Sequence, residues 1–246
     1  MNLKNKVALI TGGGTGIGRE IGLAFAREGA SIAVNYSRSE KEAFLTLQDI
    51  HELGADVVTV KADVSNDAQV RDMVKEVANK FGRLDILVNS AGTTTFVEPS
   101  DLEGLTEELW DKALAVNLKG TFFCCRAVVP AMKSHDGGSI INISSIAGTT
   151  GVGSSMAYSA SKAGVICLTK SLARTLAPEI RVNTIAPGFV DTRWTADWPE
   201  FREMHEQATP LKRVAVPEDI AEAALFLTHS DFVTGQIIIV DGGKSM

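Results

Sequence analysis

Tyr158 and Lys162 are four residues apart in the chain, and Ser145 precedes the tyrosine by thirteen positions. On a helix, a spacing of four places two side chains on the same face, one turn apart. A free tyrosine has a pKa of about 10, and a neighbouring cation favours the phenolate. We therefore expect Lys162 to lower the pKa of Tyr158 toward the range in which general acid–base catalysis works at neutral pH. Because this spacing is common by chance, the prediction depends on the rest of the chain.

The composition of the chain narrows the functional classes. It has 246 residues, 45% of them hydrophobic, and a net charge of −6. This length and composition suit one large α/β domain with a sizeable core. The negative charge argues against a nucleic-acid-binding protein, which usually carries a basic face.

Cysteine usage and the amino terminus indicate a cytoplasmic location. The chain has 3 cysteines and no Cys-x-x-Cys motif, as is typical of a reduced protein. Its first residues lack the apolar region of a signal peptide, and its longest uncharged stretch, 137–161, is too polar to span a membrane. The 4 histidines are scattered, so we expect no bound metal.

Short apolar runs alternate with helical patterns along the whole chain. We predict an α/β fold, a single doubly wound Rossmann-type domain over residues 1–246, with a seven-stranded, mostly parallel sheet and helices on both faces. The strands are expected at 6–11, 31–35, 57–61, 84–88, 139–143, 181–186 and 236–240. The helices are expected at 17–27, 41–53, 68–81, 106–132, 157–176 and 217–227.

The segment 189–213 is the least regular part of the pattern. A long connection inside a compact domain often covers a binding site. We therefore interpret this segment as a substrate lid, with a surface loop that merely packs on the domain as the alternative.

A glycine-rich turn follows the first expected strand and opens the first expected helix. Residues 11–18 read Thr-Gly-Gly-Gly-Thr-Gly-Ile-Gly. Glycines let a backbone approach a pyrophosphate closely, and a helix amino terminus favours negative charge. The spacing differs from the general Gly-x-Gly-x-x-Gly fingerprint, but its place between strand and helix predicts a dinucleotide site.

The end of the second expected strand indicates which dinucleotide binds. An NAD site usually has an acidic residue there for the ribose hydroxyl, but residues 35–38 read Asn-Tyr-Ser-Arg. A guanidinium at Arg38 suits a 2′-phosphate. We therefore predict NADP(H) in preference to NAD(H), with Ser37 and Arg38 at the phosphate. The alternative is that Arg38 is a solvated loop residue.

Taken in order, the motifs resemble those of the short-chain dehydrogenase/reductases over essentially the full chain. The resemblance is to the group of 3-oxoacyl-acyl-carrier-protein reductases above all. It rests on the glycine-rich turn, Asn89-Ser90-Ala91-Gly92, Asn117, Ser145, Tyr158-x-x-x-Lys162, Pro187-Gly188 and Val240-Asp241-Gly242-Gly243. In this order and spacing the set is highly specific.

The resemblance implies a role for each matched residue. Ser145, Tyr158, Lys162 and Asn117 are the implied catalytic residues, and Asn117 would hold a water that links Lys162 to solvent. The implied cofactor-binding residues are Gly12, Thr15, Gly16, Ile17, Gly18, Ser37, Arg38, Asp63, Val64, Asn89, Ala91, Gly92, Tyr158, Lys162, Pro187, Gly188, Val190 and Thr192.

The reaction implied by these residues is hydride transfer between a nicotinamide and a ketone or secondary alcohol. Tyr158 would exchange the proton, and Ser145 would hydrogen-bond the carbonyl oxygen. We choose Ser145 over Ser144 because neighbours on an extended strand point to opposite faces. A regulator that binds the cofactor without turnover is the alternative from another class.

The substrate is less well defined by the sequence. The pocket is expected to draw on 93–97, 149–156 and 190–206, with Trp194 and Trp198 either lining it or packing the lid on its domain. Acyl carrier protein is a possible partner, but the turn 134–139 lacks the basic residues expected for docking an acidic protein. The other basic candidates are Arg126, Lys133 and Arg174. We therefore prefer a general small-molecule ketone or alcohol, and the resemblance implies a homotetramer or homodimer.

Overall fold

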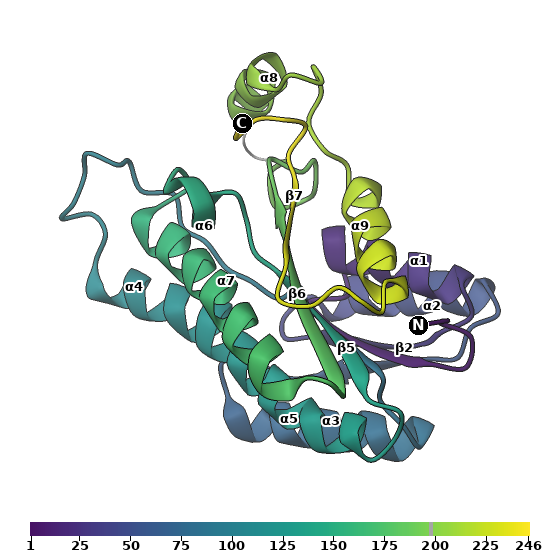
Figure 1. Cartoon of the computed structure of the whole chain (residues 1–246). Helices are drawn as coiled ribbons and strands as arrows, with labels where there is room; N and C mark the ends of the chain where they lie inside the picture. The colour runs from purple at the N-terminus through teal and green to yellow at the C-terminus, as the bar shows by residue number, and fades with distance from the viewer. Residues whose placement is uncertain (197–198) are drawn as a thin grey trace.

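The computed structural model describes residues 1–196 and 199–246, and its centre is a sheet flanked by helices (Figure 1). The strands are β1 (Val7–Thr11), β2 (Ser31–Tyr36), β3 (Val57–Lys61), β4 (Ile86–Asn89), β5 (Gly138–Ile143), β6 (Ile180–Pro187) and β7 (Ile237–Val240). The larger helices are α1 (Gly16–Arg27), α2 (Glu40–Glu52), α3 (Asp67–Phe81), α5 (Thr121–Lys133), α7 (Met156–Leu176) and α9 (Pro217–His229). The shorter helical elements are α4 (Glu107–Ala113), the π-helix η1 (Leu114–Gly120), α6 (Ala147–Thr150) and α8 (Pro199–Ala208).

The sheet has 7 strands in the order β3-β2-β1-β4-β5-β6-β7. Every pairing in it is parallel. The predicted doubly wound fold is therefore confirmed, with a wholly parallel sheet rather than a mostly parallel one. The chain moves outward from β1 in one direction up to β3 and in the other from β4 onward, so the strand order reverses between β1 and β4. A reversal of this kind opens a crevice at the carboxyl ends of the two strands.

Alternation along each strand divides the core into two layers. In β1, Ala8 and Ile10 face α1, α2 and α9, whereas Val7 and Leu9 face α3, α5 and α7. The same strand therefore contributes to both layers, as expected for a sheet buried on both sides. Figure 1 shows these two groups of helices on opposite sides of the strands.

The helix predicted over 106–132 is present, but it changes from α-helical to π-helical geometry and back along its length. It begins as α4, passes through η1 and continues as α5. Gly120 is the last residue of η1. A Cβ on this glycine would lie 2.9 Å from Val64 Cγ2, so the helix lies very close to the segment that follows β3. The whole stretch, Glu107–Lys133, is long and apolar enough to cross a membrane by length and composition alone. It instead packs against α3 and α7 in this fold, as a core helix does.

Segment 189–213 is more regular than predicted, because it contains α8. The helix begins at Pro199, and proline suits the first turn of a helix because its missing N–H has no partner to lose there. The end of this segment is tied to the carboxyl terminus, since Leu211 N–H donates to Gly242 O at 3.2 Å. Figure 1 accordingly shows α8 beside the carboxyl-terminal end of the chain.

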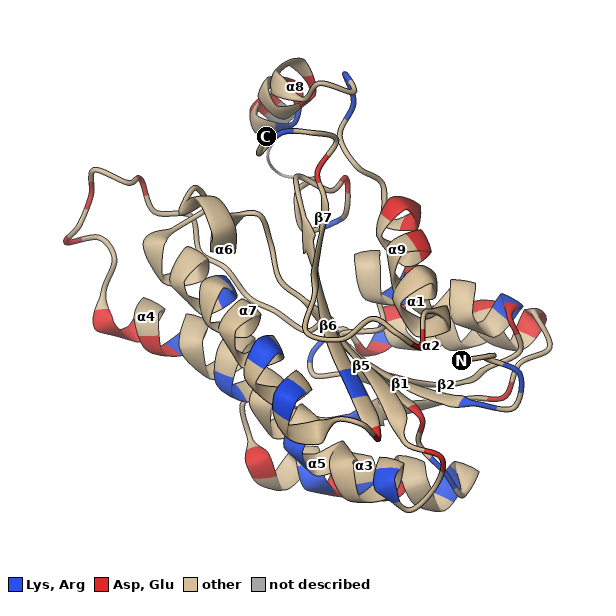
Figure 2. Ribbon diagram, in the orientation of Figure 1, with Lys and Arg blue, Asp and Glu red and all other residues tan. Residues whose placement is uncertain are grey.

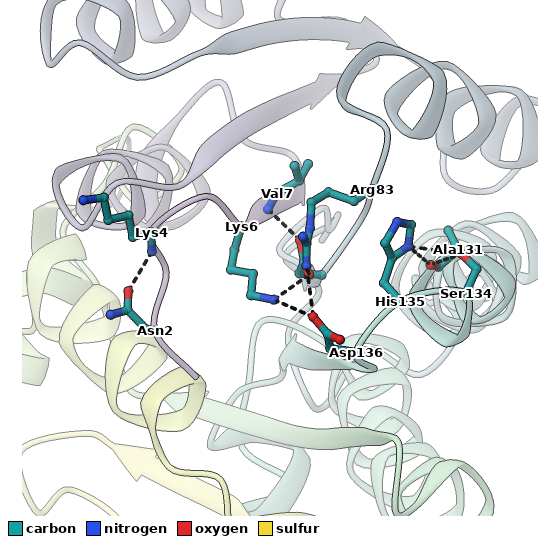
Figure 3. A network of polar contacts seen from close by, with 10 residues as sticks. Asn2, Lys4, Lys6, Val7, Arg83, Ala131, Ser134, His135 and Asp136 are labelled. Carbon is teal, nitrogen blue, oxygen red and sulfur yellow. Dashed lines mark hydrogen bonds and ion pairs between the residues drawn. The ribbon is translucent and has the colours of Figure 1, made fainter.

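A buried carboxylate joins the amino ends of the central strands. Asp85, which is 0% exposed, accepts hydrogen bonds from Val7 N–H at 2.9 Å and from Arg83 at 2.6 and 2.8 Å. Lys6 Nζ lies 3.3 Å from the same carboxylate and 3.5 Å from the exposed Asp136. Figure 3 shows Lys6, Arg83 and Asp136 converging from three segments of the chain.

The pKa of Asp85 follows from these contacts. Burial by itself raises the pKa of this carboxyl. The hydrogen bonds from Arg83 and Val7, together with the charges of Lys6 and Arg83, outweigh burial and hold the pKa below its usual value. Asp85 therefore stabilises the folded state above the unfolded pKa of about 3.9, and this contribution is lost as the pH falls through the lower folded pKa.

We expect Asp85→Asn to lower the free energy of unfolding by roughly 3 kcal/mol at pH 7, because Arg83 and Lys6 lose their buried counter-charge. Urea denaturation followed by circular dichroism measures this difference. The difference should shrink as the pH is lowered below about 4, where the unfolded chain begins to bind a proton at Asp85, and disappear below the lower folded pKa of this residue.

The matched control is Asp136→Asn, since the Asp136 side chain is 84% exposed and a surface ion pair contributes about 0–1 kcal/mol. Equal losses in the two variants would contradict a special role for the buried carboxylate.

Candidate active site

A cavity of about 820 Å³ lies at the carboxyl ends of the strands, where the strand order reverses. Its volume is within the usual range for a small-molecule site. Most of the predicted site residues line it. They are Gly12, Thr15, Gly16, Ile17, Ser37, Arg38, Asp63, Val64, Ala91, Gly92, Ser145, Tyr158, Lys162, Pro187, Gly188, Val190 and Thr192.

Gly18, Asn89 and Asn117 support the cavity from behind. A Cβ on Gly18 would lie 2.6 Å from Gly12 O, so this glycine lets the first helix pack on the turn. Asn89 is 3% exposed, and its amide donates to Asn142 Oδ1 at 2.9 Å. The implied contact of the Asn89 side chain with the cofactor is therefore not supported by its position.

The glycine-rich turn needs glycine for conformational and steric reasons. Gly12 has a φ of 64°, and a Cβ there would lie 2.9 Å from Ala91 Cα. Gly16 has a φ of 52° and lies against Thr192 of the lid segment. L-residues with side chains rarely adopt such φ values. The turn thus leaves a cradle that a side chain would fill, which suits a closely bound pyrophosphate.

Two side chains that the sequence analysis missed hold this turn. Asn35 is 1% exposed, and its amide donates to Val60 O and Ala62 O at 3.2 and 3.1 Å. Its own backbone carbonyl accepts from Gly13 N–H at 3.0 Å. Asn35 therefore ties the turn to β2 and β3. The available signal was a polar residue inside an otherwise apolar strand.

Thr11 makes the second connection, to the end of β4. Its hydroxyl oxygen accepts hydrogen bonds from Ser90 N–H and Ala91 N–H, both at 3.1 Å. These bonds satisfy two backbone donors in the segment that follows β4. The floor of the cavity is consequently fixed by hydrogen bonds among the ends of four strands, β1 to β4.

Tyr158 is positioned by the first turn of α7. The hydroxyl of Ser155, the N-cap residue, accepts from Tyr158 N–H at 3.2 Å, as in an ordinary helix cap. Lys162 follows one turn later on the same helix. The sequence prediction that the two side chains share a face is confirmed, since Lys162 Nζ lies 5.6 Å from the centre of the Tyr158 ring.

The two serines after β5 are used differently. Ser144 is buried, and its hydroxyl donates to the backbone carbonyl of Lys162 at 2.8 Å. Ser145 Oγ accepts from Ala147 N–H at 3.1 Å. A hydroxyl also has one proton to donate, and Ser145 hydrogen-bonds Tyr158. Ser145 is therefore the serine placed beside the phenol.

The pKa shifts of Tyr158 and Lys162 differ from the sequence prediction. Burial raises the pKa of Tyr158, although the hydrogen bond from Ser145 lowers it in part. Lys162 is 5% exposed, and burial lowers its own pKa to about 8. Its ammonium donates to Ile143 O at 2.8 Å rather than to the phenol. The expectation that Lys162 lowers the pKa of Tyr158 is thus wrong for this structure, because desolvation of both groups dominates.

Asn117 lies in η1 and holds the segment after β4. Its side-chain oxygen accepts from Thr93 N–H at 2.8 Å, and its amide donates to Thr93 O and Ser161 Oγ, both at 3.0 Å. Asn117 thereby joins this segment to α7. The predicted water between Asn117 and Lys162 stays a prediction.

The opposite end of the cavity is basic. Ser37 and Arg38 line it, as does Arg193 of the lid segment. Arg193 forms an ion pair with Glu42 and donates to Ser39 Oγ at 3.3 Å. The sequence analysis did not identify Arg193, because it lies 151 positions from Glu42.

The remaining wall is largely apolar and comes from the three predicted pocket segments and from Phe189, which precedes the last of them and was not predicted. It includes Phe96, Val152, Phe189, Trp194, Phe201, Met204 and His205. Phe96 packs edge-on against Phe201 of α8, with ring centres 5.3 Å apart. Trp194 is thus a lining residue, whereas Trp198 lies outside the described residues.

The cavity as a whole fits an elongated dinucleotide. A glycine cradle lies in the middle, Arg38 is at one end, and Tyr158 and Lys162 are at the other. Within residues 1–196 and 199–246, no group of three or more potential metal ligands occurs. This order of the glycine cradle and the two α7 side chains suits an elongated organic cofactor that lies next to a proton donor.

Comparisons with known proteins agree with this geometry. A family model described as enoyl-(acyl carrier protein) reductase matches residues 12–245. A 3-oxoacyl-[acyl-carrier-protein] reductase of Staphylococcus epidermidis is 41% identical over 98% of this chain and 100% of that protein. The corresponding Thermotoga maritima protein is 42% identical over 99% of each. A short-chain type dehydrogenase/reductase structure from Mycobacterium marinum has a TM-score of 0.93 at 32% identity, covering 99% of this chain and 97% of that one.

We expect Lys162→Met to raise the free energy of unfolding at pH 7. Burial lowers the folded pKa of Lys162 to about 8, so the unfolded chain binds this proton more tightly. That difference corresponds to roughly 3 kcal/mol, and leaving Ile143 O without its donor offsets about 1 kcal/mol of it. Urea denaturation should therefore show a more stable variant.

The advantage should disappear as the pH rises from about 8 through the unfolded pKa of about 10.4, because both states are then neutral at this residue. Lys170→Met is the control, since Lys170 is exposed on the same helix. A Lys162→Met variant less stable than the wild type at pH 7 would show that the buried ammonium is not a cost to folding.

Proposed function

The chain belongs to the short-chain dehydrogenase/reductase family, and we propose that it reduces ketones to secondary alcohols, reversibly, with NADP(H). As a member of this family it is an oxidoreductase acting on C=O or CH–OH groups. The observation that carries the finer proposal is the lining of one continuous cavity, which includes the glycine cradle and Arg38 together with Ser145, Tyr158 and Lys162.

The proposed mechanism assigns the proton to Tyr158. When bound, the nicotinamide supplies a hydride to the carbonyl carbon. Because burial raises the pKa of Tyr158, the phenol is protonated at neutral pH and can give its proton to the carbonyl oxygen. The Ser145 hydroxyl hydrogen-bonds the same oxygen and stabilises its developing charge.

Lys162 has two proposed tasks. Its ammonium would bind ribose hydroxyls beside the nicotinamide, in place of its present bond to Ile143 O. With a pKa of about 8, it can also lose and regain a proton near neutral pH, and so return one to Tyr158 after each reduction. Asn117 would connect this lysine to solvent through a water, as the family resemblance implies.

NADP(H) is the proposed cofactor. Arg38 lines the end of the cavity that follows β2, and Arg193 enters the same region from the lid segment. The Arg38 guanidinium favours a 2′-phosphate over an unmodified ribose, whereas Arg193 is already paired with Glu42. The carboxylate that an NAD site usually carries is absent from the end of β2 and from the residues that follow it, which read Asn35-Tyr36-Ser37-Arg38.

A 3-oxoacyl thioester carried on acyl carrier protein is the second candidate substrate. The names of the relatives from S. epidermidis and T. maritima favour it. The charge distribution argues against docking of an acidic carrier protein at this mouth. Figure 2 shows acidic residues along the loop before α4 and on α4 itself, in the segment that follows the cavity-lining Phe96.

The basic residues expected to dock a carrier protein are partly neutralised. Arg126 pairs with Asp67 at 2.5 Å, and Lys133 lies 3.7 Å from Glu179. Arg174 is exposed on α7. A small ketone or a free thioester therefore remains the preferred substrate. Turnover of acetoacetyl-acyl carrier protein, acetoacetyl-coenzyme A and ethyl acetoacetate at matched concentrations would separate the two candidates.

The proposed assembly is a homotetramer or homodimer in the cytoplasm. The outer face of α7 exposes Ala160 and Ala163, and small residues let two helices approach closely. Gly164 is used within the chain, because a Cβ there would lie 2.8 Å from Leu118 Cδ2. A non-catalytic regulator is disfavoured, since Ser145, Tyr158 and Lys162 are all present on one cavity wall.

We expect Tyr158→Phe to lower kcat for ethyl acetoacetate reduction by about 10²–10⁴-fold, the usual contribution of a general acid. NADPH binding, followed by the change in its fluorescence, should stay within about threefold of the wild type, since the ring is kept. Near-normal turnover in this variant would remove Tyr158 from the mechanism.

We expect Arg38→Ala to reduce the ratio of kcat/KM with NADPH to that with NADH by about 10- to 100-fold. This range follows from the loss of one or two charge-assisted hydrogen bonds to the 2′-phosphate. Initial rates with both cofactors measure the ratio. Arg71→Ala, on the exposed face of α3, is the control, and an unchanged ratio for Arg38→Ala would contradict the phosphate assignment.

A further inference from the structure

Polar side chains tie the lid segment to the first turn of α2. Arg193 forms an ion pair with Glu42, and its other terminal guanidinium nitrogen donates to Ser39 Oγ at 3.3 Å. Ser39 is the N-cap residue of α2, and it lines the same cavity as Arg193. The contact therefore joins two segments that both border the cavity.

The glycine-rich turn lies between these two segments. On one side, a Cβ on Gly14 would lie 3.0 Å from Ala43 N in the first turn of α2. On the other side, a Cβ on Gly16 would lie 3.3 Å from Thr192 Cγ2 in the lid segment. The glycine-rich turn, the first turn of α2 and the lid segment thus form a closed ring, which the contacts of Arg193 complete. This ring borders the cradle that suits a pyrophosphate.

The base of the lid segment is held separately, by its backbone. Asp191 N–H donates to Ala215 O at 2.8 Å, and Ala215 N–H donates to Phe189 O at 3.0 Å. Residues 192–195 follow this anchored base. Within the part of the chain that the structure describes, their hydrogen bonds and ion pairs with elements outside the lid segment all come from Arg193. Breaking these contacts would therefore release residues 192–195 from α2 and leave the base in place.

The strength of the ion pair suits a contact that opens and closes. The Arg193 side chain is 60% exposed and that of Glu42 is 34% exposed. Ion pairs this exposed add little to the stability of a fold, because water competes for both charges. The pair can therefore open and re-form at low cost each time a ligand enters or leaves the cavity.

We propose that Arg193 and Glu42, together with Ser39, form a latch that holds the lid segment closed over the bound dinucleotide. Arg193 and Glu42 are then positioning residues, which act on the cofactor through the lid segment. The latch sets how long the cofactor stays bound, and it acts on NADPH and NADH alike, because the ring borders the cradle for the pyrophosphate that both contain. This inference rests on the proposed function, since it requires a dinucleotide in the cavity.

Arg193→Ala and Glu42→Ala test the latch through the dissociation rate of the cofactor. Each variant removes one partner, so the open form of the lid segment becomes more populated and dissociation accelerates in proportion. We expect a rise of about three- to fivefold with NADPH and with NADH, the upper range for an exposed ion pair. Stopped-flow displacement, followed by nicotinamide fluorescence, measures this rate without substrate or turnover.

The double variant and an unloaded measurement sharpen the test. Arg193→Ala combined with Glu42→Ala should release the cofactor no faster than either single variant, because both changes remove the same contact. In the protein without cofactor, hydrogen exchange of the backbone at 192–195 should accelerate by a similar factor in each variant. Glu52→Ala, at the exposed far end of α2, is the matched control and should leave both measurements unchanged.

The direction of the Glu42→Ala effect separates the latch from a direct contact between Arg193 and the cofactor. If Arg193 binds a cofactor phosphate instead, removing Glu42 frees its guanidinium and slows dissociation, which would overturn the latch. Unchanged dissociation rates in both single variants, with the cofactor bound normally, would overturn the latch and leave the proposed function intact. If the wild type binds neither NADPH nor NADH, the proposed function itself is wrong, and the latch falls with it.

Discussion

The site depends on the close meeting of two parallel strand ends, β1 and β4. Thr11 pairs in register with Asn89, and its hydroxyl accepts the next two backbone N–H groups. At the same place Gly12 approaches Ala91 so closely that a Cβ would clash. This contact forms the floor of the cavity. The cofactor cradle on one side and the α7 residues on the other are positioned relative to it.

The second constraint is the burial of ionisable side chains, which disfavours their charged forms. Lys162 is buried and Tyr158 is half-buried, so the ammonium loses affinity for its proton and the phenol keeps its own. The same desolvation that makes these groups useful as proton carriers works against the stability of the folded chain. The Ile143 carbonyl partly compensates by accepting a hydrogen bond from the ammonium.

The two ends of the strands serve different purposes. Polar groups at the amino ends stabilise the fold, and polar groups at the carboxyl ends form the site. At the amino ends of the strands, Asp85 has close cationic and backbone partners, and its contacts lower its pKa. At the carboxyl ends of the strands, the buried ammonium of Lys162 donates to a neutral backbone carbonyl, Ile143 O, and pairs with no carboxylate among the described residues. Polar groups that are fully paired stabilise a fold, whereas groups left partly unpaired remain available to a ligand. This contrast is typical of α/β proteins whose site lies at the carboxyl ends of the strands.

The sequence alone was sufficient for the properties that depend on local pattern. Alternating apolar runs predicted the parallel sheet, the turn 11–18 predicted the cradle, and the spacing of Tyr158 and Lys162 predicted their shared face. The π-helical winding of η1 and the presence of α8 were not predicted, because neighbouring segments and a proline that starts a helix decide them. These elements depend on packing more than on periodicity.

Only the tertiary structure decided the pKa shifts of the site residues and their hydrogen-bond partners. The raised pKa of Tyr158 depends on how much protein surrounds the ring, and no spacing along the chain reports this. The roles of Asn35 and Arg193 likewise depend on segments far away in the sequence. Local sequence determines which face of a helix or strand a side chain occupies. Desolvation and hydrogen-bond satisfaction are instead determined by every segment that packs around that side chain, and therefore appear only when the chain is folded.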